Sequence, residues 1–277
     1  MYVGIDIGAT HTRVALAVVP NNIVQKKDFA TTSFRETIAR IVESIRLLAP
    51  EKIEAIGISS PAPLNKVQGT ILNTPNLPNW KDKPLVDMLK QELHCPVYLE
   101  HDASAGALAE FLYGQKSANP LLYLTLSTGI GGGLIKEGQI YEGTNSIHLG
   151  HQVIDKKGPK CSCGKNGCLE AFVSGWAIEK KFGKPAQEID DPAVWDEVGE
   201  NLAVGINNSV MHYLPELIVL GGGLIQKGDL LLKPLQKHLE QYFCQDIPLP
   251  SIELARLGQD SSLIGALAIA WKKYNNK

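Results

Sequence analysis

The chain has 277 residues and a formal net charge of −2 at pH 7; 44% of its residues are hydrophobic and 20% are charged. This length and composition are those of a globular protein of one or two domains. The chain has neither the basic stripe of a nucleic-acid binder nor an apolar run of the roughly 18 residues that a membrane span needs, so we expect neither partner.

The first part of the chain predicts three strands followed by alternating helices and strands. Short β-rich runs predict strands at residues 2–6, 13–19 and 23–30. Apolar residues then recur at helical spacing over 38–48, and Ser33 with Glu36 forms a plausible capping box at the start of that helix. Later elements are expected as strands at 53–59 and 96–100 and as helices at 85–93 and 103–113.

After a break at residues 114–120 the same order begins again. The expected elements are a strand at 121–126, a hairpin of 132–136 with 139–141, a helix over 198–214, a strand at 217–220 and a last helix over 264–271. The repeat is one of architecture and not of sequence. It predicts two α/β lobes with a ligand cleft between them. We place the small lobe at 1–115, closed by the C-terminal helix at about 260–277, and the large lobe at 116–259.

One glycine-containing turn follows the first strand of each lobe: residues 6–10 in the small lobe and residues 127–133 in the large lobe. Glycines let backbone N–H groups approach phosphate oxygens, hydroxyls add donors, and a nearby Asp suits Mg²⁺ or a positioned water. A third cluster at 221–223 could receive a flat adenosine. The expected nucleotide-binding residues are Asp6, Gly8, Thr10, Thr128, Gly129, Gly131, Gly221, Gly222 and Gly223.

These turns also allow other interpretations. Each turn by itself could be a tight hairpin without a ligand. The chain has no G-x-x-x-x-G-K-[ST] string, which excludes a Walker-type enzyme, and the glycines at 129–133 lead into a strand, which argues against a Rossmann dinucleotide site.

Asp102 is the candidate general base. It lies where the strand at 96–100 gives way to a helix, and phosphoryl transfer to an alcohol needs a group that accepts the hydroxyl proton. The spacing alone favours a structural role instead, in which Asp102 is the N-cap of that helix, a position that Asp often fills.

One histidine and three cysteines are spaced as a metal site: His151, Cys161, Cys163 and Cys168. One imidazole and three thiolates make a closed tetrahedral zinc set, so we expect a structural zinc site; unligated buried cysteines are the alternative. The chain has five cysteines, and this clustering favours a metal in a reducing compartment over disulfides. Because Met1 leads into an apolar segment without a basic lead, we expect a cytoplasmic protein.

Together these motifs resemble the ROK family of bacterial sugar kinases from about residue 3 to 272, and the string Cys161–Glu170 fits the family's zinc motif fully. The resemblance implies an α/β, two-lobed actin-like and hexokinase-like ATPase fold made of duplicated ribonuclease H-like units. It also implies ATP with Mg²⁺, a small sugar as acceptor, and a homodimer.

The resemblance implies that Asp102 is the catalytic base, that Glu170 and His151 contact the sugar, and that Asn76 is a further sugar-side residue. Two further sugar-side positions depart from the family: His101 stands where Asn is usual, and His148 where Glu is usual. Neutral His offers one donor and one acceptor in a different geometry from either residue. Alternatively, either His fills space or bonds to a neighbour.

Milder departures are Ala9 in place of glycine in the first turn and Ala62 in place of glycine in Pro61-Ala62-Pro63. Alanine would not suit a glycine position with positive φ.

The leading hypothesis is an ATP-dependent hexose kinase, with glucose as the default acceptor and the 6-hydroxyl as the reacting group. The alternatives within this class are kinases of N-acetylmannosamine, N-acetylglucosamine, fructose or another modified hexose. From another class come non-catalytic sugar-binding proteins and the family's repressors, which carry a helix-turn-helix before the kinase-like region; here the first strand is expected at residue 2.

Overall fold

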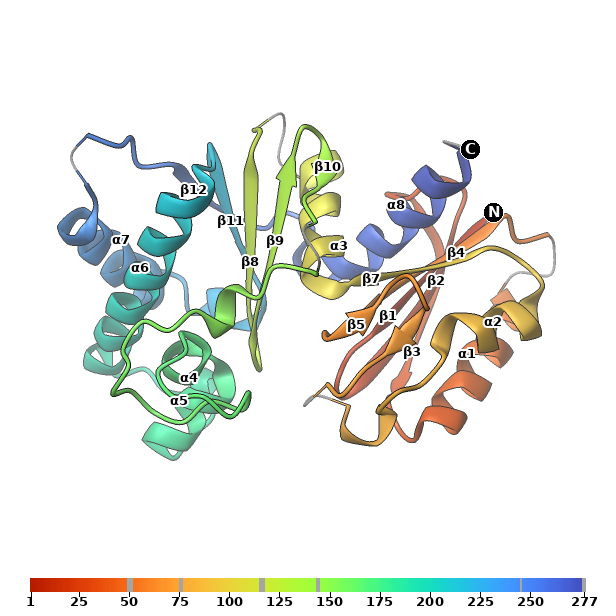
Figure 1. Cartoon of the computed structure of the whole chain (residues 1–277), viewed down its shortest axis with the longest axis horizontal. Coiled ribbons are helices and arrows are strands. Elements are labelled where there is room, and N and C mark those ends of the chain that lie inside the picture. The colour runs from red at the N-terminus through yellow and green to blue at the C-terminus, as the bar shows by residue number, and fades with distance from the viewer. Residues whose placement is uncertain (49–51, 75–76, 115–117, 143–144, 245, 276–277) are drawn as a thin grey trace. The chain divides into compact units, whose positions relative to one another are not determined.

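The computed structural model, shown in Figure 1, describes residues 1–48, 52–74, 77–114, 118–142, 145–244 and 246–275. The chain divides into two compact units. Met1–Gly114 with Asp260–Lys277 form the first, and Gln115–Gln259 the second. No helix in the described ranges combines the length and the apolar character that a membrane span requires.

The first unit is built around a five-stranded sheet in the order β3-β2-β1-β4-β7. Its strands are β1 (Tyr2–Ile7), β2 (His11–Ala17), β3 (Ile23–Ala30), β4 (Ala55–Ser60) and β7 (Val97–His101), with a small hairpin of β5 (Leu64–Asn65) and β6 (Thr70–Ile71). Its helices are α1 (Phe34–Leu48), η1 (Pro78–Trp80), α2 (Leu85–Leu93), α3 (Asp102–Ala109), η2 (Glu110–Gly114), η6 (Gly258–Asp260, which straddles the boundary between the units) and α8 (Ser261–Asn275). β1 runs antiparallel to β2 and parallel to β4, and β4 is parallel to β7.

The second unit repeats this plan with the sheet order β10-β9-β8-β11-β12. Its strands are β8 (Leu121–Leu126), β9 (Ile130–Lys136), β10 (Gln139–Ile140), β11 (Leu217–Gly221) and β12 (Ser251–Leu254). Its helices are η3 (Leu149–His151), α4 (Glu170–Val173), α5 (Gly175–Phe182), η4 (Ala186–Glu188), α6 (Pro192–Tyr213), η5 (Gly223–Lys227) and α7 (Asp229–Tyr242). β8 is antiparallel to β9 and parallel to β11. The architectural repeat expected from the sequence is therefore confirmed.

The two faces of the first sheet carry side chains of different size, and helices pack on them at different distances. Val3, Ile5 and Ile7 point to one face and form a core with α1 and α2. On the opposite face stand small residues, and a Cβ built at Gly57 would overlap the carbonyl oxygen of Ala266 in α8. Because no side chain stands between Gly57 and Ala266, α8 approaches β4 closely there, and the chain just before α8 comes to the end of the sheet where Asp6 stands.

One face of the second sheet is covered by α6 and α7, as Figure 1 shows. Leu122, Leu124 and Leu126 alternate along β8 and enter the same apolar core as Trp195 of α6 and Leu235 of α7. The one polar side-chain atom of the fully buried Trp195 is satisfied, because its indole N–H donates to the Ile189 carbonyl at 2.8 Å.

Several expected elements are confirmed. The strands at 23–30 and 121–126 have the expected bounds. The expected hairpin is formed by β9 and β10, which are joined by the turn Glu137–Gly138, where both residues have positive φ. The Ser33 hydroxyl donates to the Glu36 carboxylate at 2.9 Å, while the Glu36 N–H approaches the same hydroxyl at 3.4 Å. A capping interaction therefore starts α1, as predicted.

Other expectations need correction. The helix expected at 103–113 is α3 only to Ala109 and then widens into the π-helix η2. The buried Glu110 carboxylate, which accepts from Ser261 at 2.9 Å, fills the space that a side chain at Gly114 would need. The expected strand at 13–19 is β2, which starts at His11 and ends at Ala17, and the glycines at 131–133 lie inside β9. Helices α4, α5 and α7 and strand β12 were not predicted.

Candidate functional site

The carboxyl ends of three parallel strands gather acidic and hydroxyl side chains at one edge of the first sheet. In the register, Asp6 of β1 lies opposite Ser59 of β4, and Ser59 lies opposite Glu100 of β7. Asp102 follows as the first residue of α3. Ligands of open α/β sheets bind outside the carboxyl ends of the strands, so this edge is the candidate site of the first unit.

Asp6 is buried, and both of its oxygens have partners. The Ser59 hydroxyl donates to Oδ1 at 2.5 Å, and Arg13 donates to Oδ2 from Nη2 at 2.5 Å and from Nε at 3.1 Å. Burial raises the pKa of Asp6 above its ordinary value, the charge of Asp102 adds to this, and Arg13 and Ser59 oppose it.

Arg13 continues this network to the start of the last helix. Its Nη1 donates to Asp260 at 3.0 Å, and Lys26 Nζ contacts both oxygens of the same carboxylate at 2.9 and 3.0 Å. Sequence reasoning missed Arg13 and Asp260 because 247 positions separate them. The local signal that could have found Arg13 is its place in β2, where it lies opposite Asp6.

Asp102 is more exposed than the acids beside it, at 32% of its side chain. Its Oδ1 accepts from the Ala103 N–H at 2.7 Å and lies 3.0 Å from Nε2 of His101, which is buried. The N-cap position of α3 belongs to His101, whose side chain makes no capping hydrogen bond. Asp102 thus begins the helix without being its N-cap, and its carboxylate stands at the helix N-terminus.

The glycine turns have well-defined backbones. In the first unit the Gly8 N–H donates to the His11 carbonyl at 2.8 Å, and Thr10 is exposed. Ala9 is not among the described residues with positive φ, so alanine is unstrained there. In the second unit the Ser127 N–H donates to the Gly129 carbonyl at 3.0 Å, and Thr128 is exposed.

Within the third cluster, Gly222 must be a glycine for two reasons. Gly221 ends β11, and Gly222 has a φ of 89°, which disfavours any side chain. A Cβ at Gly222 would also overlap the backbone of Leu126 at the end of β8. Gly223 then opens η5, with nothing near its Cβ position. The cluster therefore leaves free space beside a strand end.

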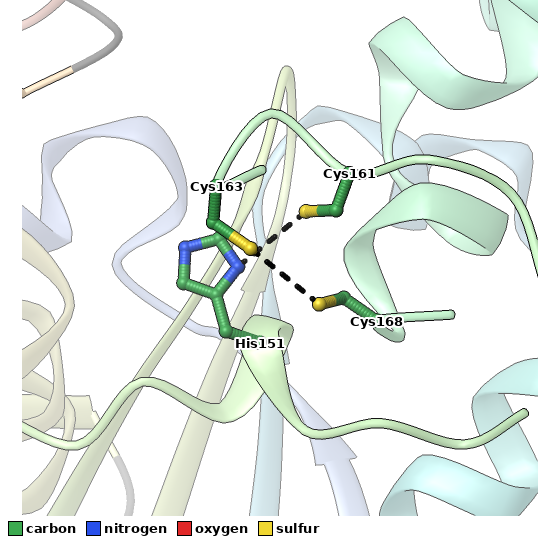
Figure 2. A group of neighbouring side chains, drawn as sticks. All are labelled: His151, Cys161, Cys163 and Cys168. Carbon is green, nitrogen blue, oxygen red and sulfur yellow. Dashed lines mark hydrogen bonds between the residues drawn. The ribbon is translucent and has the colours of Figure 1, made fainter. Parts of the chain in front are cut away.

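Figure 2 shows that the side chains of His151, Cys161, Cys163 and Cys168 turn toward one centre. One ligand atom from each lies within 4.8 Å of all the others. Cys163 and Cys168 have sulfurs 3.7 Å apart, and Cys161 Sγ lies 3.7 Å from His151 Nδ1. Two sulfurs about 2.3 Å from a tetrahedral zinc ion would stand about 3.8 Å apart, so the donor set fits zinc.

The loop that carries the cysteines is held by backbone hydrogen bonds. The Cys161 N–H donates to the Lys165 carbonyl at 2.8 Å, and the Gly164 N–H donates to the Cys161 carbonyl at 3.0 Å. Burial raises the pKa of the Cys168 thiol to about 12, and the neighbouring Cys163 and Cys161 add to the effect. A metal ion would reverse this, because its charge favours the thiolates.

Glu170 joins the cysteine loop to the glycine turn of the second unit. Its Oε2 accepts from the Ile130 N–H at 3.0 Å, and its Oε1 accepts from the Ser162 hydroxyl at 3.1 Å. A Cβ at position 129 would come within 2.9 Å of the Glu170 carboxylate, so a side chain there would displace that carboxylate. Each carboxylate oxygen keeps capacity for a second hydrogen bond.

The structure brings together some of the expected site residues and not others. The zinc ligands form one cluster, and the His148 and His151 rings stack with centroids 6.1 Å apart. Asp6 and Asp102 share one edge of the first sheet. Asn76 lies outside the described residues.

The comparisons with known proteins identify the class. The ROK family matches residues 2–273, and the chain therefore belongs to the ROK family. A glucokinase from Thermotoga maritima is 31% identical, with 96% of each chain covered, and a fructokinase from Lactococcus lactis is 33% identical, with 90% of this chain and 87% of the relative covered.

A solved structure gives the same result for the fold. The ROK glucokinase from Streptomyces griseus, in complex with glucose and AMPPNP, is 25% identical and superposes with a TM-score of 0.83 over 98% of this chain and 99% of that one. The fold is the two-lobed actin-like and hexokinase-like fold of these kinases.

Replacing Arg13 with Met should destabilise the protein in a pH-dependent way. The pKa of Asp6 is already above the ordinary 3.8, and losing Arg13 would raise it further. Above pH 3.8 the unfolded chain ionises Asp6 more readily than the folded chain does, so the loss should grow with pH, to about 3 kcal/mol near neutrality. Urea denaturation of the variant and the wild type at pH 4.5 and pH 8 measures the difference.

The double variant Asp6→Asn/Arg13→Met is the control, because it has no carboxylate at position 6 to ionise. Its stability relative to the wild type should depend less on pH than that of the single variant. Equal losses for Arg13→Met at both pH values would contradict the ion-pair role.

Proposed function

We propose that this ROK protein catalyses the transfer of the γ-phosphoryl group of ATP to a hydroxyl of a hexose. The observation that carries the proposal is the carboxylate of Asp102, which is partly exposed beside the buried Asp6 at the carboxyl edge of the first sheet. The family membership and the glucokinase and fructokinase relatives support the same reaction.

In the proposed mechanism, Asp102 accepts the proton of the reacting hydroxyl as the sugar oxygen attacks the γ-phosphorus. Phosphoryl transfer requires little covalent chemistry from the protein, so positioning and charge neutralisation supply most of the rate. We assign three segments to nucleotide binding: the glycine turns at 8–10 and 127–129 and the cluster at 221–223. Gly131, which follows the second turn in the sequence, is assigned to the nucleotide as well. Their backbone N–H groups and the exposed hydroxyls of Thr10 and Thr128 donate to phosphate oxygens.

Mg²⁺ bound with ATP would neutralise charge on the phosphates. In such sites Mg²⁺ keeps several waters and uses few protein ligands. Asp6 fits this role as an acceptor for such a water, because Ser59 and Arg13 fix its carboxylate while Oδ1, which accepts only from Ser59, keeps capacity for a second hydrogen bond.

We assign the sugar side to Asn76, His148, His151 and Glu170, with glucose as the default acceptor at its 6-hydroxyl. The chemistry of His151 supports a double role. With Nδ1 facing the cysteines, its Nε2–H remains available to donate to a hydroxyl. Glu170 likewise retains acceptor capacity after binding Ile130 and Ser162.

We assign a structural zinc ion to His151, Cys161, Cys163 and Cys168. The four residues would fill a tetrahedral shell, so the ion would brace the loop and leave no position for a reacting water. Through Glu170, the braced loop would support the glycine turn at 127–129.

Purified protein should contain close to one zinc ion per chain, and Cys163→Ser should lose it because three ligands hold zinc less tightly than four. The matched control is Cys244→Ser, which replaces an exposed cysteine outside the cluster. Elemental analysis with thermal unfolding measures both effects. Metal-free protein of full stability would contradict the assignment.

Asp102→Asn should lower kcat by about 10² to 10⁴ while nucleotide binding stays nearly unchanged, because only proton acceptance is removed. ADP release with Mg-ATP is measured against glucose, mannose, fructose, N-acetylglucosamine and N-acetylmannosamine, with Asp87→Asn in α2 as the control. A near-normal rate of Asp102→Asn would remove Asp102 from the mechanism. If wild-type protein that binds nucleotide turns over none of these sugars, glucose and the other tested hexoses are excluded as acceptors.

The family resemblance also leads us to propose a homodimer, and the clustered cysteines lead us to propose a cytoplasmic location. Light scattering of the purified protein should give twice the mass of one chain, and a single-chain mass at working concentration would contradict the dimer.

A further inference from the structure

The side chain of His101 is buried and lies against the carboxylate of Asp102, the proposed base. Only 4% of the residue is exposed, and its Nε2 lies 3.0 Å from Oδ1 of Asp102. An ionised carboxylate only accepts hydrogen bonds, so the tautomer of His101 with its proton on Nε2 is the one that favours this contact. The same oxygen accepts from the Ala103 N–H at 2.7 Å. The Ala103 N–H and the His101 imidazole therefore both contact Oδ1.

We propose that His101 is a positioning residue that directs the proton of the sugar hydroxyl to Oδ2 of Asp102. The inference rests on the proposed kinase function and deepens it. With Oδ1 held by His101 and Ala103, the carboxylate is fixed in rotation and Oδ2 is the oxygen that accepts the proton. The sugar O–H bond breaks toward Oδ2, the O–P bond to the γ-phosphorus forms, and the bond to the departing ADP breaks.

The backbone of His101 is itself held in place. Its N–H donates to Glu100 Oε1 at 2.8 Å, and Lys66 Nζ contacts both Glu100 oxygens at 3.1 Å. In the sheet, His101 lies opposite Ser60 of β4. These contacts fix the point from which the imidazole reaches Asp102, and such pre-organisation strengthens a positioning group.

The alternative is that His101 contacts the sugar, as the Asn usual at this position implies. The two roles can be separated by the distance from the backbone at which a side-chain nitrogen is needed. The amide nitrogen of Gln reaches about as far as Nε2 of His, whereas that of Asn reaches only about as far as Nδ1. Gln at position 101 should therefore preserve the contact with Asp102, and Asn should not.

The experiment compares His101→Gln, His101→Asn and His101→Leu with the wild type, on the sugar that the panel identifies. We expect His101→Gln to keep kcat within about tenfold, and the other two to lose about 100-fold in kcat with KM for sugar changed less than about threefold. His101→Asn at wild-type kcat, or losses confined to KM, would overturn the proposal.

A double-mutant cycle tests whether His101 acts through Asp102. In the Asp102→Asn background, adding His101→Leu should leave the residual rate within about twofold. An independent further loss of about 100-fold would overturn the proposal. Thermal unfolding and nucleotide binding of every variant exclude misfolding, and the polar variant His101→Gln covers the case in which His101→Leu fails to fold.

His238→Leu is the matched control. His238 is also buried, with Nε2 3.2 Å from Oδ1 of Asp196, but it lies on α7 of the second unit. Its replacement should leave kcat unchanged. A crystal structure of His101→Asn gives a readout that does not depend on turnover: an Asp102 carboxylate in the wild-type orientation would overturn the proposal even if the kinase assignment itself fails.

Discussion

The charge of buried carboxylates is the constraint on which the first unit depends. Removing the partner of a buried charge typically costs about 3 to 5 kcal/mol, so each acid at the end of the sheet needs a cation or donor of its own. Asp6 has Arg13 and Glu100 has Lys66; the buried Glu110, which follows α3, accepts from the Ser261 hydroxyl. These partners come from distant segments, so the pairs also fix how β2, the hairpin near Lys66 and α8 meet the strands.

The duplicated sheet explains why acids gather in one unit and glycines in the other. In both units the first, fourth and fifth strands of the sheet in chain order are parallel and end at the same edge. The first unit places charged side chains at that edge, while the second leaves it as backbone at Ser127–Gly129 and Gly221–Gly223. Acids suit proton acceptance and magnesium, and bare backbone suits phosphate and a flat base.

Much of this was predictable because it depends on short spacing. Strand order follows from alternation and turn residues, and the histidine–cysteine cluster follows from donors within eighteen positions of one another. The partners of Asp6 and Glu100 were not predictable, since Arg13 and Lys66 look like ordinary surface cations in sequence. The π-helix at Glu110 was missed for a similar reason: its buried carboxylate is satisfied by Ser261, 151 positions away. From the sequence we expected His101 to contact the sugar, because it directly precedes Asp102. The sequence does not show that the side chain of His101 is buried.

The glycines beneath and within α8 have a consequence for engineering. Exchanging glycine for alanine often stabilises a protein by about 0.4 to 1 kcal/mol, because the unfolded chain loses freedom. Alanine at Gly57 or Gly265 would not give this stabilisation. A methyl group at Gly57 would overlap the carbonyl of Ala266, and one at Gly265 would overlap the carbonyl of Ala105. Ala105 lies in the first turn of α3, the turn that Asp102 begins. A thermostability programme that replaced Gly265 would therefore displace the helix that begins with Asp102, the proposed base.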